Sequence, residues 1–206
     1  MYCPDIFREP RPEVLQDFIR SHPLGLLISS GANGITANLI PFHLQAGVLR
    51  CHLARANPQW KEIDGQSVLV VFRGPDEYIS PSVYATKAQT GKVVPTWNFV
   101  MVQARGRAKL QDRADWLTDQ LNDLTASREA PRAEAWSVGD APPDYIARQM
   151  KHIVGVEIEV ASLEGKWKVS QNQPEANRRS VHAALSAAES THEMADWVKI
   201  YGKLEQ

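Results

Sequence analysis

Short apolar stretches separated by turn-forming residues dominate the first quarter of the chain. The stretch 24–28 is continuously apolar and predicts a buried β-strand. Two further strands are expected at 35–44 and 48–53, and Asn33-Gly34 before the first of them is a strong β-hairpin signal. Three strands joined by short turns favour antiparallel pairing in a meander or a barrel.

Two more apolar stretches, 68–72 and 99–102, predict a second pair of buried strands in the middle of the chain. The segment that joins them is rich in hydroxyl groups and aromatic rings. It also contains Pro95, which cannot donate a backbone hydrogen bond. We therefore expect the segment 93–98 to run along an edge or a barrel rim.

The late part of the chain carries one clear alternating pattern. Valine and isoleucine at 154, 156, 158 and 160 alternate with glycine and glutamate, which predicts a strand with one solvated face. The next residues, 163–166, have the composition of a turn, and 167–170 is expected to continue in an extended conformation.

Apolar residues at helical spacing predict helices at the N-terminus, in one crossover and at the C-terminus. The first expected helix begins at Pro12 and ends before Pro23. The second covers 112–128, with Asp112 as its cap, and the third runs from 143 to 150. Two terminal helices are expected around 181–188 and 194–201. The count is about six or seven strands, so the sequence predicts an α+β fold built on a small barrel.

Composition excludes several classes of protein. The chain has 206 residues, a net charge of −1 and a pI near 6.6, so it lacks the overall basic character of a DNA-binding domain. No apolar run is long enough for a membrane span, and no secretory signal is visible. The two cysteines form no disulfide framework, and no spacing suggests a zinc site, so we expect a cytoplasmic protein without a metal.

The connection between the two middle strands carries the candidate chemistry. A segment held between buried strands can fix its side chains in position, which suits a binding site. Hydroxyl and ammonium groups could hold an anion, and aromatic rings could contact a flat ring, as in a nucleotide or a flavin. The alternative is a well-ordered connection whose aromatics fill the core. The anion-binding candidates are Ser80, Lys87 and Thr96, and the aromatic candidates are Tyr78, Tyr84 and Trp97.

A second candidate for anion binding precedes this connection. Asn57 followed by Pro58 predicts a helix N-terminus, where free backbone N–H groups favour an anion, and Arg55 lies just outside it. His52 could donate to the same anion. The alternative is a capped surface turn with a solvated arginine and a structural histidine.

With these segments placed, the chain resembles the PaiB family of FMN-binding negative transcriptional regulators, within the FMN-binding split-barrel superfamily. Each matching motif is short, but together they run in unbroken order from residue 1 to about residue 172. The motifs are Met1-Tyr2-x-Pro4-x-x-Phe7, His52 to Trp60, Phe72-x-Gly74-Pro75, Tyr78 to Lys87, Val94 to Asn98, Ile153 to Gly155, and Glu164 to Asn172.

The resemblance implies a six-stranded antiparallel split β-barrel with peripheral helices, over residues 1–172, and a C-terminal helical tail, 173–206, that packs on the barrel or on the dimer mate. It also implies a homodimer that binds FMN in a cleft shared by two subunits. The phosphate would lie near His52, Arg55 and Asn57, and the phosphate or ribityl chain near Ser80 and Lys87. The isoalloxazine would lie near Thr96, Trp97 and Asn98. Residues of the late strand, from the same or the partner subunit, would also approach the cofactor: Lys168, Ser170 and Gln171.

Two positions depart from the family pattern. Relatives commonly have tryptophan at the position of Val83 and histidine at the position of Leu39. The loss of a large ring and a hydrogen-bond donor would reshape the flavin pocket.

Three functions follow as hypotheses. The first is the FMN-binding transcriptional regulator that the resemblance implies. Its local basic candidates for direct DNA contact are Arg178, Arg179, Lys166 and Lys168. The second is a flavin-dependent oxidoreductase of the pyridoxamine-phosphate-oxidase-like type, in which the cofactor carries the redox chemistry. The third is a dimer without flavin whose pocket binds something else. No residue pair is identified as catalytic, so whether the chain is an enzyme stays open.

Overall fold

The computed structural model describes residues 1–32 and 34–204, and these fall into two compact units. Unit 1 comprises Met1–Leu15, Arg73–Val102 and the chain from Glu164 onward. Unit 2 comprises Gln16–Phe72 and Gln103–Leu163. Three long strands pass from one unit into the other: β6 (Ser67–Ile79), β7 (Thr96–Gln111) and β8 (Ile153–Lys168).

Unit 2 holds two antiparallel hairpins. The first is formed by β2 (Leu24–Gly31) and β3 (Gly34–Pro41), and the second by β4 (His43–Gln45) and β5 (Val48–Ala54). The predicted antiparallel hairpins are therefore confirmed, although Asn33 of the first turn lies outside the described residues. The strand expected over 35–44 is divided at Phe42.

The described strands form one sheet in the order β3-β2-β6-β7-β8-β5-β4, with β1 (Arg8–Glu9) pairing to β8 outside this path. This gives eight described strands and an open order, in place of the six strands that the resemblance implied. The fold is α+β with a large antiparallel sheet, as expected.

Apolar side chains on one face of the strands form the core of unit 2. Leu27 of β2 is fully buried. Gly25 lies two residues earlier on the same face of the strand, and a Cβ at this position would lie 2.7 Å from the side chains of Val70 and Phe72. Such close approach between β2 and β6 requires glycine at position 25. The other core strands contribute Leu49, Cys51 and Leu53 from β5 and Val154, Val156 and Ile158 from β8.

The helices of unit 2 follow the sequence pattern with one correction. Helix α4 covers Ala114–Glu129 and α5 covers Pro143–Met150, close to their expected bounds, and a 3-10 turn, η3 (Val138–Asp140), precedes α5. Asp112 does not cap α4, because the N-cap residue is Arg113. The carboxylate of Asp112 pairs instead with Arg55.

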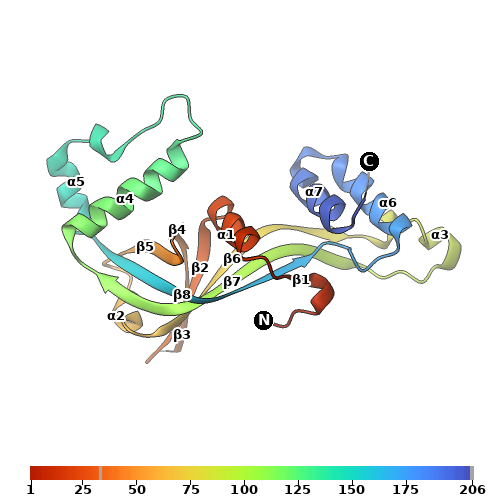
Figure 1. Ribbon diagram of the computed structural model, residues 1–206, viewed down its shortest axis with the longest axis horizontal. Helices are drawn as coiled ribbons and strands as arrows, with labels where there is room; N and C mark the ends of the chain where they lie inside the picture. Colours follow the sequence, from red (N-terminus) through yellow and green to blue (C-terminus); the bar gives the residue numbers. More distant parts are fainter. Residues whose placement is uncertain (33, 205–206) are drawn as a thin grey trace. The chain divides into compact units, whose positions relative to one another are not determined.

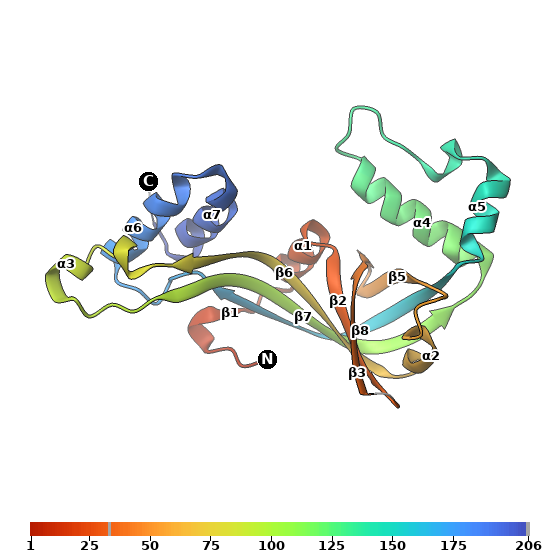
Figure 2. The ribbon, with the colours of Figure 1, turned by 180° about the vertical axis from the view of Figure 1, so that it is seen from behind.

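Unit 1 contains the far ends of β6, β7 and β8 together with β1 and several helical segments. Helix α1 (Pro12–Ser21) has the bounds that its pattern predicted, and its first residues belong to unit 1. The other segments are η1 (Asp5–Phe7), η2 (Pro81–Val83), α3 (Lys87–Thr90), α6 (Glu175–Ser186), η4 (Glu189–Thr191) and α7 (His192–Tyr201). The two terminal helices are confirmed and lie side by side (Figures 1 and 2).

Two expectations about the strand ends in unit 1 were wrong. Residues 163–166 are not a turn, since β8 continues through them and pairs with β1 at Gly165 and Lys166. The strand that contains Thr96–Asn98 is not an edge strand of the sheet, because β7 runs between β6 and β8. Residues 93–95 precede this strand, and the barrel-rim alternative stays a prediction. Pro95 precedes the first residue of β7, so its missing N–H removes no hydrogen bond from the sheet.

A cluster of aromatic rings packs α7 onto β8 in unit 1. Trp167 is fully buried, and its ring centroid lies 5.8 Å from that of Trp197 and 6.0 Å from that of Tyr201. The hydroxyl of Tyr201 donates to the buried carboxylate of Glu9, and Arg11 donates to both oxygens of that carboxylate. The buried charge is thus fully paired, as a stable core requires.

This arrangement predicts a specific loss of stability in acid. Burial by itself raises the pKa of Glu9, but the hydrogen bonds from Arg11 and Tyr201 outweigh it and hold the pKa below its ordinary value of 4.5. A carboxyl group with a lowered folded-state pKa stabilises the fold above its unfolded pKa, and this contribution disappears as the pH falls through the folded value. In urea unfolding between pH 3 and pH 7, Glu9→Gln should be less stable than the parent at pH 7 and should lose less stability on acidification. The exposed Glu13→Gln is the control, and equal acid slopes for parent and Glu9→Gln would contradict the assignment.

Candidate functional site

An exposed pair of aromatic rings stands at the ends of two neighbouring strands in unit 1. Tyr78 lies near the end of β6 and Trp97 near the start of β7. Their ring centroids are 5.8 Å apart at an interplanar angle of 63°. Tyr78 is 51% exposed and Trp97 is 54% exposed, so the sheet holds both rings in place without covering them. A fixed apolar surface of this kind suits a flat ligand ring.

A partly buried lysine lies next to this surface. The ammonium group of Lys168 on β8 donates to the hydroxyl of Thr96 and to the backbone carbonyl of Trp97. Burial lowers the pKa of Lys168, and the positive charge of Lys166 lowers it further. The ammonium of Lys166 lies 5.3 Å from the centroid of Phe99. Lys168 is therefore the cation next to Trp97, and Lys166 lies over the neighbouring ring of Phe99.

Three residues that were predicted to contact the cofactor have hydrogen-bond partners within the protein, and their contact with the cofactor stays a prediction. Asn98 and Ser170 are both buried, and each donates to the other, with donor–acceptor distances of 3.0 and 3.1 Å. Gln171 accepts from the backbone N–H of Val169 at 2.8 Å and donates to the carbonyl of Trp167. The bonds between Asn98 and Ser170 tie the segment that follows β8 to β7, and those of Gln171 hold that segment against the last residues of β8.

The connection between β6 and β7 is ordered by local bonds and by α6. The hydroxyl of Ser80 accepts from the N–H of Ser82 and starts η2. Tyr84 is buried, its hydroxyl has no hydrogen-bond partner among the described residues, and burial raises its pKa. Asn177 of α6 accepts from the N–H of Thr86 at 3.0 Å. Lys87, at the start of α3, is exposed.

The three residues expected at the phosphate lie in unit 2, with existing partners. His52 Nδ1 is 2.8 Å from the side-chain oxygen of Gln120. Arg55 donates from Nε to the carbonyl of Lys151 at 3.1 Å and pairs with Asp112. Asn57 accepts from the N–H of Gln59 at 3.0 Å.

The predicted helix at this position begins later than expected. Helix α2 covers only Trp60–Ile63, with Gln59 as the N-cap residue, so Pro58 is not its first residue. Asn57 makes its cap-like bond in the turn before the helix. The anion-binding character of this region therefore rests on Arg55 and not on a helix N-terminus.

A pocket of about 750 Å³ opens beside Arg55 within unit 2. Arg55 and Asp112 line one part of it, and residues of α4, η3 and α5 line the rest. Its lining contains no aromatic ring. The pocket therefore provides cationic and apolar surface, while the described aromatic surface for a flat ring belongs to unit 1.

The structure thus divides the predicted site into two sets. One set, in unit 1, brings Tyr78, Trp97, Thr96 and Lys168 together. The other, in unit 2, comprises His52, Arg55 and Asn57. The joint binding of one phosphate by Arg55 and Lys87 remains a prediction, since these residues belong to different units.

Sequence reasoning missed two features of the site. Asp112, the ion-pair partner of Arg55, was interpreted as a helix cap. Phe99, between the charges of Lys166 and Lys168, was interpreted only as strand core. The spacing of the two lysines at alternate positions of one strand would have placed them on the same face.

No cluster of histidine, cysteine, aspartate and glutamate in the described part of the chain could hold a metal ion. Among the helices of the described residues, none has the length and apolar character needed to cross a membrane.

Comparison with known proteins identifies the class of this protein. Residues 1–162 match the family described as "Putative FMN-binding domain". The chain is 33% identical over 222 residues to an uncharacterised protein of Emericella nidulans, covering 88% of each chain. It is 28% identical over 195 residues to the protease synthase and sporulation protein PAI 2 of Bacillus subtilis, covering 92% of this chain and 91% of that one. The chain therefore belongs to the FMN-binding domain family, and its resemblance to PaiB is confirmed.

The fold agrees with this assignment. The FAD and heme binding protein of Mycobacterium smegmatis superimposes with a TM-score of 0.57 at 13% identity, covering 78% of this chain and 73% of that one. At this identity the likeness concerns the fold alone. FMN is the cofactor that the family assignment supports, in agreement with the sequence analysis.

Proposed function

We propose that the chain is an FMN-binding protein in which the isoalloxazine ring lies on the surface formed by Tyr78 and Trp97. The observation that carries this proposal is the exposed, sheet-fixed aromatic pair next to the partly buried ammonium of Lys168. Bound FMN would supply redox chemistry, and Lys168 would place a positive charge at the edge of the ring surface. Arg55 and Lys87 would bind the phosphate.

We infer further that the cofactor cleft lies between two copies of the chain. An apolar outer face on β2, β3 and β6 supports a homodimer. Ile35 is 79% exposed, Leu39 62% and Leu24 54%, although the opposite face of these strands already packs into the core. Leu26 pairs with Leu39 on one side and with Val71 on the other, so the face is continuous across three strands. A large exposed apolar patch of this kind marks a protein interface.

Of the two flavin functions, an oxidoreductase is the one that the hydrogen bonds of the basic residues favour. All four basic residues considered for DNA contact have partners within unit 1. Arg178 donates to the carbonyl of Gln173, Arg179 pairs with Glu175, Lys166 donates to the carbonyl of Tyr2, and Lys168 donates to Thr96 and Trp97. Among the residues that the structure describes, only Arg179 of these four is paired with a carboxylate, so the other three keep their charge. A DNA phosphate would, however, have to compete with the hydrogen bonds that these groups already make.

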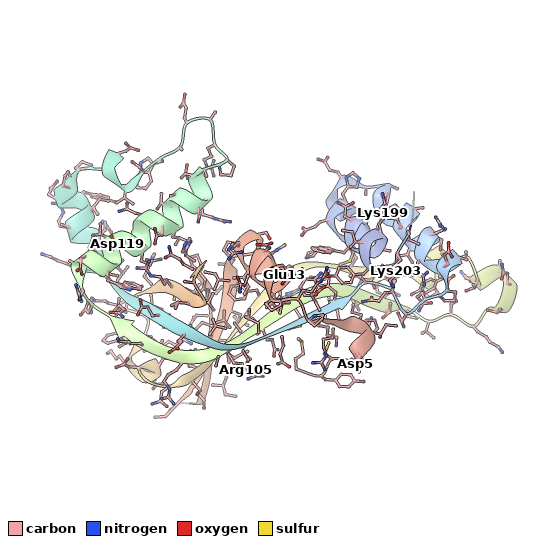
Figure 3. The ribbon with its side chains drawn as sticks, in the orientation of Figure 1. Asp5, Glu13, Arg105, Asp119, Lys199 and Lys203 are labelled. Atoms are coloured by element: carbon pink, nitrogen blue, oxygen red, sulfur yellow. The ribbon has the colours of Figure 1, made fainter. Side chains whose placement is uncertain are left out.

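A transcriptional regulator remains the second candidate, supported by the resemblance to the PaiB family. Lys199 in α7 and Lys203 just after it are further basic residues of the terminal segment (Figure 3). Asp196, however, lies on the same helix and lines the same small groove as these two lysines.

Absorbance and cofactor analysis of freshly purified protein tests the flavin proposal first. A yellow protein with one FMN per chain supports it, and a colourless protein that takes up no FMN favours a dimer that binds something else. Bleaching of the flavin colour by NAD(P)H under anaerobic conditions would favour the oxidoreductase. A salt-sensitive mobility shift with the protein's own promoter fragment would favour the regulator.

Lys168 provides a more specific prediction. Lys168→Met retains the length of the side chain and removes the charge, and we expect it to weaken FMN binding about tenfold, because a hydrogen bond involving a charged group contributes about 1.5–3 kcal/mol. Fluorescence titration of the FMN-free protein measures the effect, with Lys203→Met as the control. Unchanged affinity in Lys168→Met would place the ring elsewhere.

A further inference from the structure

We propose that the groove between α4 and α5 in unit 2 is a separate binding site for an aliphatic carboxylic acid. Helices α4 and α5 and η3 line a solvent-open groove of about 750 Å³, which lies within the range of roughly 300–1,000 Å³ typical of small-molecule sites. The groove shares Arg55 with the proposed phosphate contact of the flavin, whereas Lys151 and the helix residues of the groove have no part in that proposal. The groove belongs to a part of the chain that the ring-binding surface does not use.

The groove exists because apolar side chains line it and small residues leave it open. Helix α4 contributes Ala114 and Leu117, and α5 contributes Ile146, Ala147 and Met150 at helical spacing on one face. None of the residues of α5 is buried, although its apolar residues lie on this face. An amphipathic helix normally buries its apolar face, so the structure leaves room for an apolar ligand.

The chemistry of the lining selects the ligand. Its ionisable side chains are Arg55, Lys151 and Asp112, so the lining carries a net single positive charge. Lys151 is exposed immediately after α5, and its backbone carbonyl accepts from Arg55. Arg55 has five N–H donors, of which the bonds to Lys151 and Asp112 use only part. One carboxylate head group would balance this charge.

The body of the ligand is expected to be aliphatic. No aromatic ring lines the groove, so a planar ring would find no stacking partner there. Leucine, isoleucine and methionine offer apolar contact, and methionine in particular adapts to a flexible chain. We therefore assign the site to a monocarboxylate with a medium-length alkyl chain.

Calorimetric titration of the purified full-length protein with sodium decanoate tests the assignment. We expect saturable binding of one decanoate per chain and no comparable binding of decylamine, which has the same chain and the opposite charge. Lys151→Glu should weaken decanoate binding at least tenfold by reversing the charge at the head group. Ala147→Trp should do so by filling the groove. The matched controls are Lys92→Glu, an exposed lysine of unit 1, and Ala126→Trp, an exposed alanine of α4 outside the groove lining.

Each contrary outcome is distinguishable from a failure of the flavin proposal, because bound flavin is followed by its absorbance in the same samples. Absence of saturable decanoate binding, equal binding of decylamine, or unchanged binding in both groove variants would overturn the assignment. Release of FMN by decanoate would show that the groove is not separate from the FMN phosphate contact, with which it shares Arg55, and would equally overturn the assignment. A change of oligomeric state in Ala147→Trp, without decanoate binding to the parent, would identify the groove as a protein interface. Thermal unfolding checks that the variants fold.

Discussion

A chain in which Arg55 and Lys87 are both replaced by alanine is expected to bind FMN about 10²- to 10⁴-fold more weakly than the parent. Each residue would donate a charge-assisted hydrogen bond to the phosphate, and such bonds contribute about 1.5–3 kcal/mol each. The two positions lie in different units, so a joint effect on one ligand would show that a single phosphate uses both. Fluorescence titration of the FMN-free variants measures the affinity.

The controls for this experiment come from the same local environments. Arg113 is paired with a nearby aspartate, as Arg55 is, although Arg113 is more exposed, and Lys92 is an exposed lysine in the same connection as Lys87. The double variant Arg113→Ala with Lys92→Ala should therefore bind FMN as the parent does. If the Arg55 and Lys87 variant retains parental affinity while remaining folded, the phosphate has been assigned to the wrong residues.

A comparison of the single variants separates the two contributions. Replacing Arg55 alone also leaves Asp112 without its cationic partner, and the unpaired carboxylate would repel the phosphate. Asp112→Asn combined with Arg55→Ala removes this repulsion. Recovery of part of the affinity in that variant would indicate that Asp112 lies near the phosphate.

The elements with strong local patterns could be predicted from the sequence. Helix α1 and the glycine-containing turn between β4 and β5 are determined by residues that are close in the sequence. Both were predicted to within a few residues of their observed positions. The terminal helices were placed for the same reason. Such features depend on periodicity and turn chemistry, which a single sequence displays directly.

The length of the late strand could not be predicted, because its glycine was interpreted as a turn residue. Gly165 lies within β8, where the side chains of Leu15 and Trp167 occupy the space that a Cβ would need. Its role is close packing and not a change of chain direction. Only the tertiary neighbours distinguish the two roles, since the residue is the same in both.

The same limit applied to the site. The residue types were recognised, but the bonds of Lys168 to Thr96 and Trp97 join positions about 70 residues apart in the sequence. The pairing of Arg55 with Asp112 spans 57 positions. Long-range partners of this kind decide whether a polar residue faces a ligand or supports the fold. Asn98 and Ser170 bond to each other across 72 positions, and their predicted contact with the cofactor stays a prediction.

The variant with glutamate at both Ile35 and Leu39 is expected to be monomeric at concentrations where the parent is a dimer. Both side chains are exposed on the outer face of β3, so charged residues there should leave the monomer folded. In a dimer, the two substitutions would bury four unpaired carboxylates, and the desolvation of each costs several kcal/mol. Analytical ultracentrifugation gives the oligomeric state. If the cleft is shared by two subunits, the loss of the dimer should also lower the FMN content.

The control replaces an exposed isoleucine of unit 1 by glutamate. Ile200 on α7 is 60% exposed, and Ile200→Glu should leave both the oligomeric state and the FMN content unchanged. A dimeric Ile35 and Leu39 variant would show that another surface joins the subunits. A monomeric variant that keeps full FMN affinity would show instead that one chain is sufficient to bind the flavin. That outcome would contradict the proposed cleft between two copies of the chain.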